Sequence, residues 1–151
     1  MKFEIIPRKS VGPIQFGMKQ KQLREILSWK FHELPYREER SFREDIFPEI
    51  GVSTTYDDKL LCCVAVMLEY PAESVFIGRN ILDKNYSKEN LERFLESVDP
   101  LIQVEIDGIL SEKLGIFVNF DFDEENYEED EPEGYIQDSV TIFKELFGII
   151  L

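Results

Sequence analysis

Carboxylates are the side chains best able to do chemistry in this sequence, and they are concentrated in one short segment. Residues 121–133 contain nine of them and no lysine or arginine, which gives the segment a formal charge of −9. The rest of the chain holds 22 acidic and 17 basic residues, so most of the net charge of −14 comes from this segment. A surface of this sign attracts a basic partner and repels nucleic-acid phosphates and anionic membranes.

Two aromatic residues, Phe122 and Tyr127, are interspersed with these carboxylates. They would supply apolar anchors in a protein contact, which a segment that only keeps the protein soluble does not need. We therefore predict a partner-binding surface, with a solvated, solubilising loop as the alternative. The predicted binding residues are Asp121, Phe122, Asp123, Glu124, Glu125, Tyr127, Glu128, Glu129, Asp130, Glu131 and Glu133.

The start of the acidic segment resembles a calcium loop, because Asp121, Asp123 and Glu125 alternate as EF-hand ligands do. The register then fails. Position six is Asn126 where the loop needs glycine, and position twelve is Pro132 where it needs a bidentate glutamate. The sequence thus predicts neither a metal site nor a cofactor.

Other catalytic groups are scarce. His32 is the only histidine, so one imidazole would have to serve any triad, and a histidine-rich metal site is impossible. Cys62 and Cys63 are adjacent in a strand-like run, where successive side chains point to opposite faces, and we interpret them as small reduced core residues. No glycine-rich phosphate loop is present. We expect a binding protein rather than an enzyme.

Two amphipathic stretches predict the helices that position these residues. Residues 18–27 and 86–95 both carry apolar side chains at spacings of three and four, the stripe of a helix with one buried face. Leu23 and Leu91 are equivalent in this pattern, and Ser87 is a suitable N-cap for the second helix. Both leucines are therefore expected to be buried.

Two similar hairpins are predicted to follow the helices. The first joins residues 51–58 to 60–70, and the run from Leu60 to Leu68 is apolar on both faces, as in a central strand. The second starts at Gly115 and resumes at Tyr135 with Val140 and Ile142 facing inward. It is longer by an acidic insertion at about 121–134. The alternation around Ile102, Val104 and Ile106 predicts another half-buried strand.

These elements predict an α+β fold with one domain over residues 1–151. We expect two similar halves, about 1–72 and 73–151, each with a helix and antiparallel strands. Together they would form a curved sheet with two helices on one face. The apolar end, residues 147–151, is expected either to pack on the core or to form a homodimer contact.

The apolar content predicts a folded chain, and no apolar run approaches the roughly 20 residues of a membrane helix. The N-terminus lacks the apolar stretch of a signal peptide. These features predict a soluble cytoplasmic protein that inserts into no membrane and binds no nucleic acid directly.

Residues 11–18, Val-Gly-Pro-Ile-Gln-Phe-Gly-Met, followed by an amphipathic helix, resemble the opening of small bacterial proteins that include immunity proteins of toxin systems. The tandem layout of helix and sheet is also similar in outline to the β-lactamase inhibitor protein, although the disulfides and secretion signal of that protein are missing here. The resemblance implies a binding protein rather than a catalyst. Together with the acidic segment, it leads us to predict an immunity or inhibitor-type protein that occludes a basic site on a toxin, with a nuclease as one candidate. The alternative is a regulatory or scaffold domain that binds a basic protein or peptide.

Overall fold

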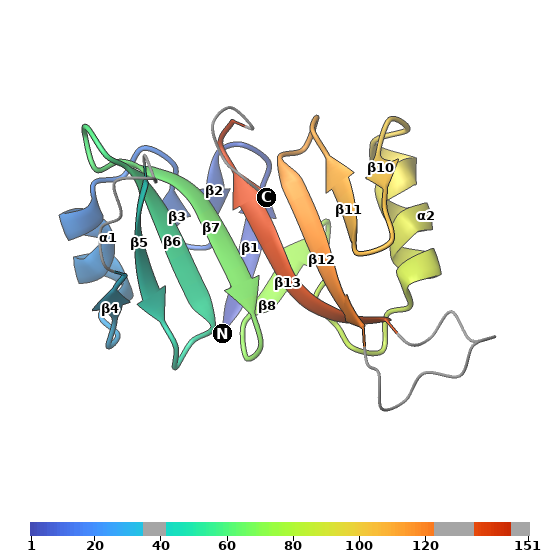
Figure 1. Cartoon of the computed structure of the whole chain (residues 1–151), viewed down its shortest axis with the longest axis horizontal. Helices are drawn as coiled ribbons and strands as arrows, with labels where there is room; N and C mark the ends of the chain where they lie inside the picture. The colour runs from blue at the N-terminus through green and yellow to red at the C-terminus, as the bar shows by residue number, and fades with distance from the viewer. Residues whose placement is uncertain (35–41, 123–134, 146–151) are drawn as a thin grey trace.

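The computed structural model describes residues 1–34, 42–122 and 135–145. Within these residues the chain forms thirteen strands and two helices, which Figure 1 shows as a broad sheet with one helix near each end. Strand accounts for 45% and helix for 16% of the structure. The strands form two sheets, one of eight strands and one of five.

The eight-stranded sheet has the order β10-β11-β12-β13-β7-β6-β5-β4, and all neighbouring strands in it are antiparallel. Strands from the first part of the chain occupy one half of this sheet, and strands from the second part occupy the other. The two groups meet where β7 pairs with β13. The strands are β4 (His32–Glu33), β5 (Phe42–Phe47), β6 (Val52–Asp57), β7 (Cys63–Glu69), β10 (Gln103–Val104), β11 (Gly108–Ser111), β12 (Ile116–Phe122) and β13 (Tyr135–Phe143).

The inner face of this sheet is built from cross-strand rows of apolar side chains. One row crosses six strands through successive register partners, and each of its residues is at most 1% exposed. The row consists of Phe47, Val52, Leu68, Val140, Val118 and Ile109. Alternate residues of a strand point to the same face, so further rows of this kind lie two residues away. The predicted central position of the 60–70 strand is confirmed, since β7 lies between β6 and β13.

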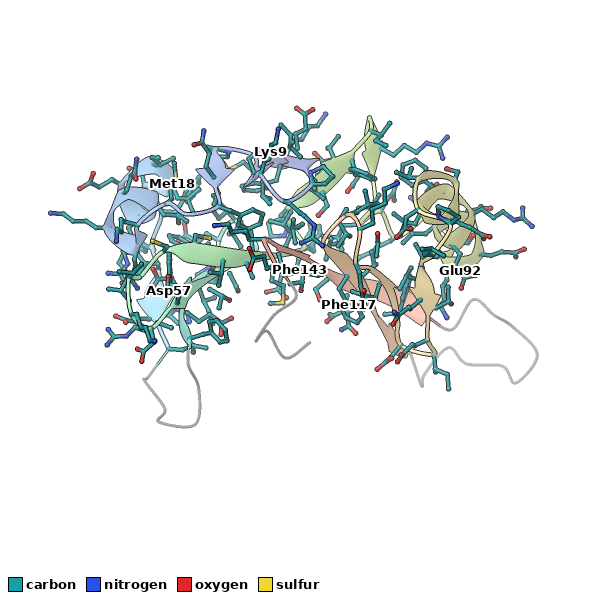
Figure 2. All side chains as sticks on the ribbon, turned by 90° about the horizontal axis from the view of Figure 1, so that it is seen from above. Lys9, Met18, Asp57, Glu92, Phe117 and Phe143 are labelled. Carbon is teal, nitrogen blue, oxygen red and sulfur yellow. The ribbon has the colours of Figure 1, made fainter. Side chains whose placement is uncertain are left out.

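The five-stranded sheet has the order β3-β2-β1-β8-β9 and lies on one side of the larger sheet (Figure 2). Its strands are β1 (Lys2–Ile6), β2 (Ser10–Val11), β3 (Ile14–Gln15), β8 (Glu73–Phe76) and β9 (Arg79–Asn80). The central pair, β1 and β8, is parallel. Arg8 connects the two sheets, because its guanidinium donates to the carbonyl groups of Glu112, Lys113 and Lys144.

Helices α1 (Gln20–Leu27) and α2 (Lys88–Val98) confirm both predicted helices. Leu23 and Leu91 are fully buried, as the periodicity predicts. Ser87 is the N-cap of α2, and its Oγ accepts the Asn90 N–H at 3.1 Å. The helices lie near opposite ends of the eight-stranded sheet in Figure 1.

The predicted fold class is wrong. The structure is mostly β, with two sheets, and is not a balanced α+β layout of one sheet with two helices on one face. The physical reason lies in residues 2–15 and 73–80. Their backbone groups pair with each other and form the second sheet. The apolar end, residues 147–151, lies outside the described residues.

Candidate functional site

The predicted acidic insertion lies at one end of the β12–β13 hairpin. Asp121 and Phe122 belong to β12, and their backbones pair with Ile136 and Tyr135 of β13. The described residues on either side of 123–134 are therefore paired in the sheet. The other predicted binding residues lie outside the described residues: Asp123, Glu124, Glu125, Tyr127, Glu128, Glu129, Asp130, Glu131 and Glu133.

The corresponding β6–β7 hairpin closes on a compact turn. The carboxylate of Asp57 accepts the backbone N–H groups of Lys59, Leu60 and Cys62 at 3.1, 2.6 and 2.9 Å. Burial raises the pKa of this carboxyl group, but these hydrogen bonds lower it more, so its pKa lies below the ordinary value. The turn of the first hairpin is thus satisfied internally, whereas the second hairpin carries the acidic segment.

The loop between β10 and β11, residues 105–107, packs beside the β12–β13 hairpin. The Phe120 N–H donates to the carbonyl of Asp107 at 2.8 Å, and the Glu105 N–H donates to that of Gly108. A Cβ atom at position 108 would lie 2.5 Å from the ring of Phe117, so a larger residue here would displace that ring. The close approach fixes residues 105–107 against β12.

The exposed side chains at this place combine carboxylates with apolar groups. Glu105, Asp107 and Asp138 are exposed, and Asp138 accepts the side-chain amide of Asn119, which pairs with Gly108. Ile106 is 76% exposed and Val104 is 47% exposed. We call Val104, Glu105, Ile106, Asp107 and Asp138 the acidic corner.

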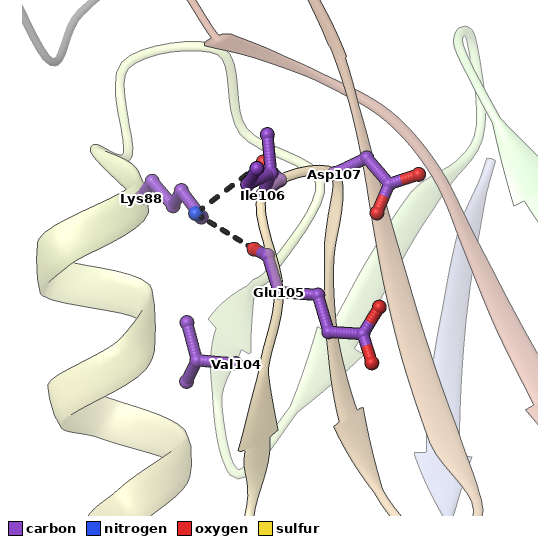
Figure 3. A pocket seen from close by; sticks show the side chains of 5 residues that line it. All are labelled: Lys88, Val104, Glu105, Ile106 and Asp107. Carbon is purple, nitrogen blue, oxygen red and sulfur yellow. Dashed lines mark hydrogen bonds between the residues drawn. The ribbon is translucent and has the colours of Figure 1, made fainter.

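Lys88 of α2 contacts the backbone of this loop. The Nζ of Lys88 donates to the backbone carbonyls of Glu105 and Ile106 at 3.0 and 3.5 Å. Figure 3 shows the carboxylates of Glu105 and Asp107 pointing away from Lys88, toward the same side. Lys88, Val104 and residues 105–107 line a shallow, open depression of about 750 Å³.

Sequence reasoning missed this depression. The alternation at Ile102, Val104 and Ile106 predicted inward-facing side chains, but β10 ends at Val104 and both Val104 and Ile106 are exposed. A pattern of alternate apolar residues shows which residues share a side, but it does not show whether anything covers that side.

The other candidate groups lie elsewhere in the fold. His32 is exposed on the edge strand β4. Cys63 is buried, and its burial raises the thiol pKa to about 12, which keeps the sulfur protonated and unreactive near neutral pH. In the part of the chain that the structure describes, no three His, Cys, Asp or Glu side chains gather as metal ligands.

Comparison with known proteins gives no relative. No protein-family model, no curated protein sequence and no solved structure matches this chain. Among residues 1–34, 42–122 and 135–145, neither helix has the length and apolar character needed to cross a membrane.

Proposed function

We propose that this protein is a non-catalytic, immunity-type inhibitor that occludes a basic site on a partner protein. The observation that carries the proposal is the hydrogen bond from Phe120 to Asp107. It places Glu105, Ile106 and Asp107 against the hairpin that carries the nine carboxylates of residues 121–133. Two acidic segments that are separate in the sequence thus support the same kind of contact.

The two kinds of side chain in this region have different roles in the proposed complex. Carboxylates would take the positions where the partner's basic site holds an anionic substrate, and opposite charge speeds association at low salt. Ile106 and Val104 would supply apolar contact area that is removed from water, and such central contacts mainly slow dissociation. A nuclease is the partner class whose basic site best fits this description.

The test uses the protein as bait and two sets of charge changes. Partners are captured from source cells on the immobilised chain, identified and purified, and their binding is measured by surface plasmon resonance at two salt concentrations. The test variant combines Glu105→Gln and Asp107→Asn with Glu→Gln at 124, 125, 128 and 129. The control variant carries Glu25→Gln and Glu96→Gln, which remove exposed charge from the two helices.

We expect the test variant to associate much more slowly at low salt, with a smaller difference at high salt, because exposed charges are screened beyond about 8 Å at physiological ionic strength. The control variant should associate at a rate close to that of the unchanged protein. The unchanged protein should also inhibit the partner's activity. Binding without inhibition would favour a scaffold domain, and equal rates for all three proteins would overturn the acidic binding surface.

A further inference from the structure

The hairpin between β8 and β9 has an unusual residue at its tip. Its two turn residues are Ile77 and Gly78, with φ angles of +49° and +75°. Glycine adopts this left-handed conformation readily, but in a β-branched residue the Cβ atom crowds the backbone carbonyl. Two-residue turns of this kind favour asparagine, aspartate or glycine at the position of Ile77. An isoleucine here works against the local stability of the turn.

Burial does not compensate for this conflict, because Ile77 is 62% exposed. The hairpin is nevertheless held firmly. The rings of Phe76 in β8 and Phe94 in α2 pack edge to face, with their centroids 6.0 Å apart. The guanidinium of Arg79 lies 4.8 Å from the ring of Phe94 and donates to the Tyr86 hydroxyl at 2.9 Å. The tip is therefore a rigid support that presents an apolar side chain to the outside, the arrangement expected of a binding anchor.

Apolar side chains and two cations are exposed beside this tip, together with the carboxylate of Glu4 on β1. Ile6 and Ile77 each lie two residues beyond the paired residues Glu4 and Val75 of the parallel strands, so they lie at the same end of that pair. Ile6 is 47% exposed. Arg79 and Lys9 are exposed, and Lys9 lies at the outer side of the smaller sheet in Figure 2. We call Ile6, Lys9, Ile77 and Arg79 the basic knob.

The acidic corner has the complementary properties. Its exposed apolar residues, Val104 and Ile106, lie in the shallow depression and are flanked by the carboxylates of Glu105 and Asp107. We propose that the protein associates with a second copy of itself, the basic knob of one copy seated on the acidic corner of the other. Ile77 then contacts Val104 and Ile106, while Lys9 and Arg79 face Glu105 and Asp107.

The contact is heterologous, because the two surfaces come from different elements of the fold. Each copy therefore keeps a free knob or a free corner, and association proceeds beyond the dimer unless a ring closes. The surfaces are small, and contacts below about 1,200 Å² are typical of weak, transient association. The association also competes with the partner that we propose for the acidic corner.

Sedimentation velocity on the purified protein, from about 10 µM to about 1 mM to cover weak association, tests this contact. The unchanged protein should form larger species as concentration rises, and less so at high salt. Ile77→Asn removes the knob and Ile106→Asn removes the corner, so each variant alone should stay monomeric. A 1:1 mixture retains one intact pair of surfaces and should form dimers but nothing larger.

Ile77→Asn also provides its own folding control. Asparagine tolerates the left-handed conformation, so this variant should melt at a higher temperature than the unchanged protein while it loses association. A monomeric unchanged protein at about 1 mM, undiminished association of Ile77→Asn, or a mixture without dimers would each overturn the proposal. No outcome depends on the basic partner, so the proposed function is tested separately.

Discussion

A buried aspartate lies at each of the two junctions between a helix and the eight-stranded sheet, but the two aspartates have different hydrogen-bond partners. Asp45 of β5 is fully buried and accepts two hydrogen bonds of 2.8 Å from the guanidinium of Arg24 in α1. Asp99, which directly follows α2, is 2% exposed and accepts the Ser111 hydroxyl at 2.7 Å and the Leu101 N–H at 3.0 Å. One end has an ion pair, and the other has a carboxylate with neutral donors.

The comparison extends to the sheet itself. Asp45 and Ser111 lie at opposite ends of one cross-strand row, and both are fully buried. Between them the row contains Thr54, Val66, Ile142 and Ile116. At the first end the sheet supplies the carboxylate and the helix supplies the donor. At the second end the sheet supplies the donor, Ser111, and the residue after the helix, Asp99, supplies the carboxylate, so donor and acceptor are exchanged.

The ion pair at the α1 end should be the more costly of the two to break. Hydrogen bonding to Asp45 raises the pKa of the Arg24 guanidinium above its ordinary value, although burial opposes this. Arg24→Met keeps most of the side-chain stem but leaves Asp45 as a buried charge without its cation. We expect a loss of about 3–5 kcal/mol in the free energy of unfolding, measured by urea denaturation.

Arg93→Met is the matched control for that change, because Arg93 pairs with Glu89 on the exposed side of α2. Exposed ion pairs of this spacing contribute about 0.3–0.5 kcal/mol. Similar losses for Arg24→Met and Arg93→Met would show that the α1 end does not depend on its ion pair.

Leu23→Ala and Leu91→Ala compare the packing of the two helices. Both leucines are fully buried, and each truncation should lower the free energy of unfolding by about 2–5 kcal/mol. Ile26→Ala is the control on α1, because Ile26 is 43% exposed, and it should cost less than either. A small effect at only one of the two leucines would show that the helices are packed to different degrees.

Ser111→Ala tests the neutral junction at the α2 end. It removes the hydroxyl that donates to Asp99 and accepts the Leu114 N–H at 3.1 Å. A buried polar group left without its partner costs about 1–3 kcal/mol, so we expect a loss of that size in urea denaturation. A loss equal to that of Arg24→Met would remove the distinction between the two ends.

Asp57→Ala probes a third carboxylate, one that closes a turn instead of joining a helix. Loss of its hydrogen bonds to backbone N–H groups should cost about 0.5–2 kcal/mol at neutral pH, as at a helix N-cap. The folded-state pKa of Asp57 is lowered, so its stabilisation is present above the unfolded value, near 3.8, and is lost as pH falls through the folded value. Urea denaturation at several pH values should show the difference between the two proteins shrinking on acidification. A difference that does not change with pH would contradict this account.

The sequence by itself determined the features that depend on local periodicity. The spacing of apolar residues within 18–27 and within 86–95 predicted two helices, with Leu23 and Leu91 on their buried faces. Ser87 predicted the N-cap of the second helix. The run of apolar residues from Leu60 to Leu68 predicted a central strand. The structure has β7 there, although it begins only at Cys63 and Leu60 is 65% exposed. Such patterns survive in the fold because neighbouring residues of a helix or strand keep their relative orientation wherever the element is placed.

Only the tertiary structure decided which of these elements pair and which sides they cover. The parallel pairing of β1 with β8 joins segments about seventy residues apart, and it created the second sheet that the predicted fold class lacked. The partners of Asp45 and Asp99, and the exposure of Val104 and Ile106, likewise depend on segments distant in the chain. Periodicity fixes which side chains point the same way, but burial and charge pairing depend on what the rest of the chain brings against them.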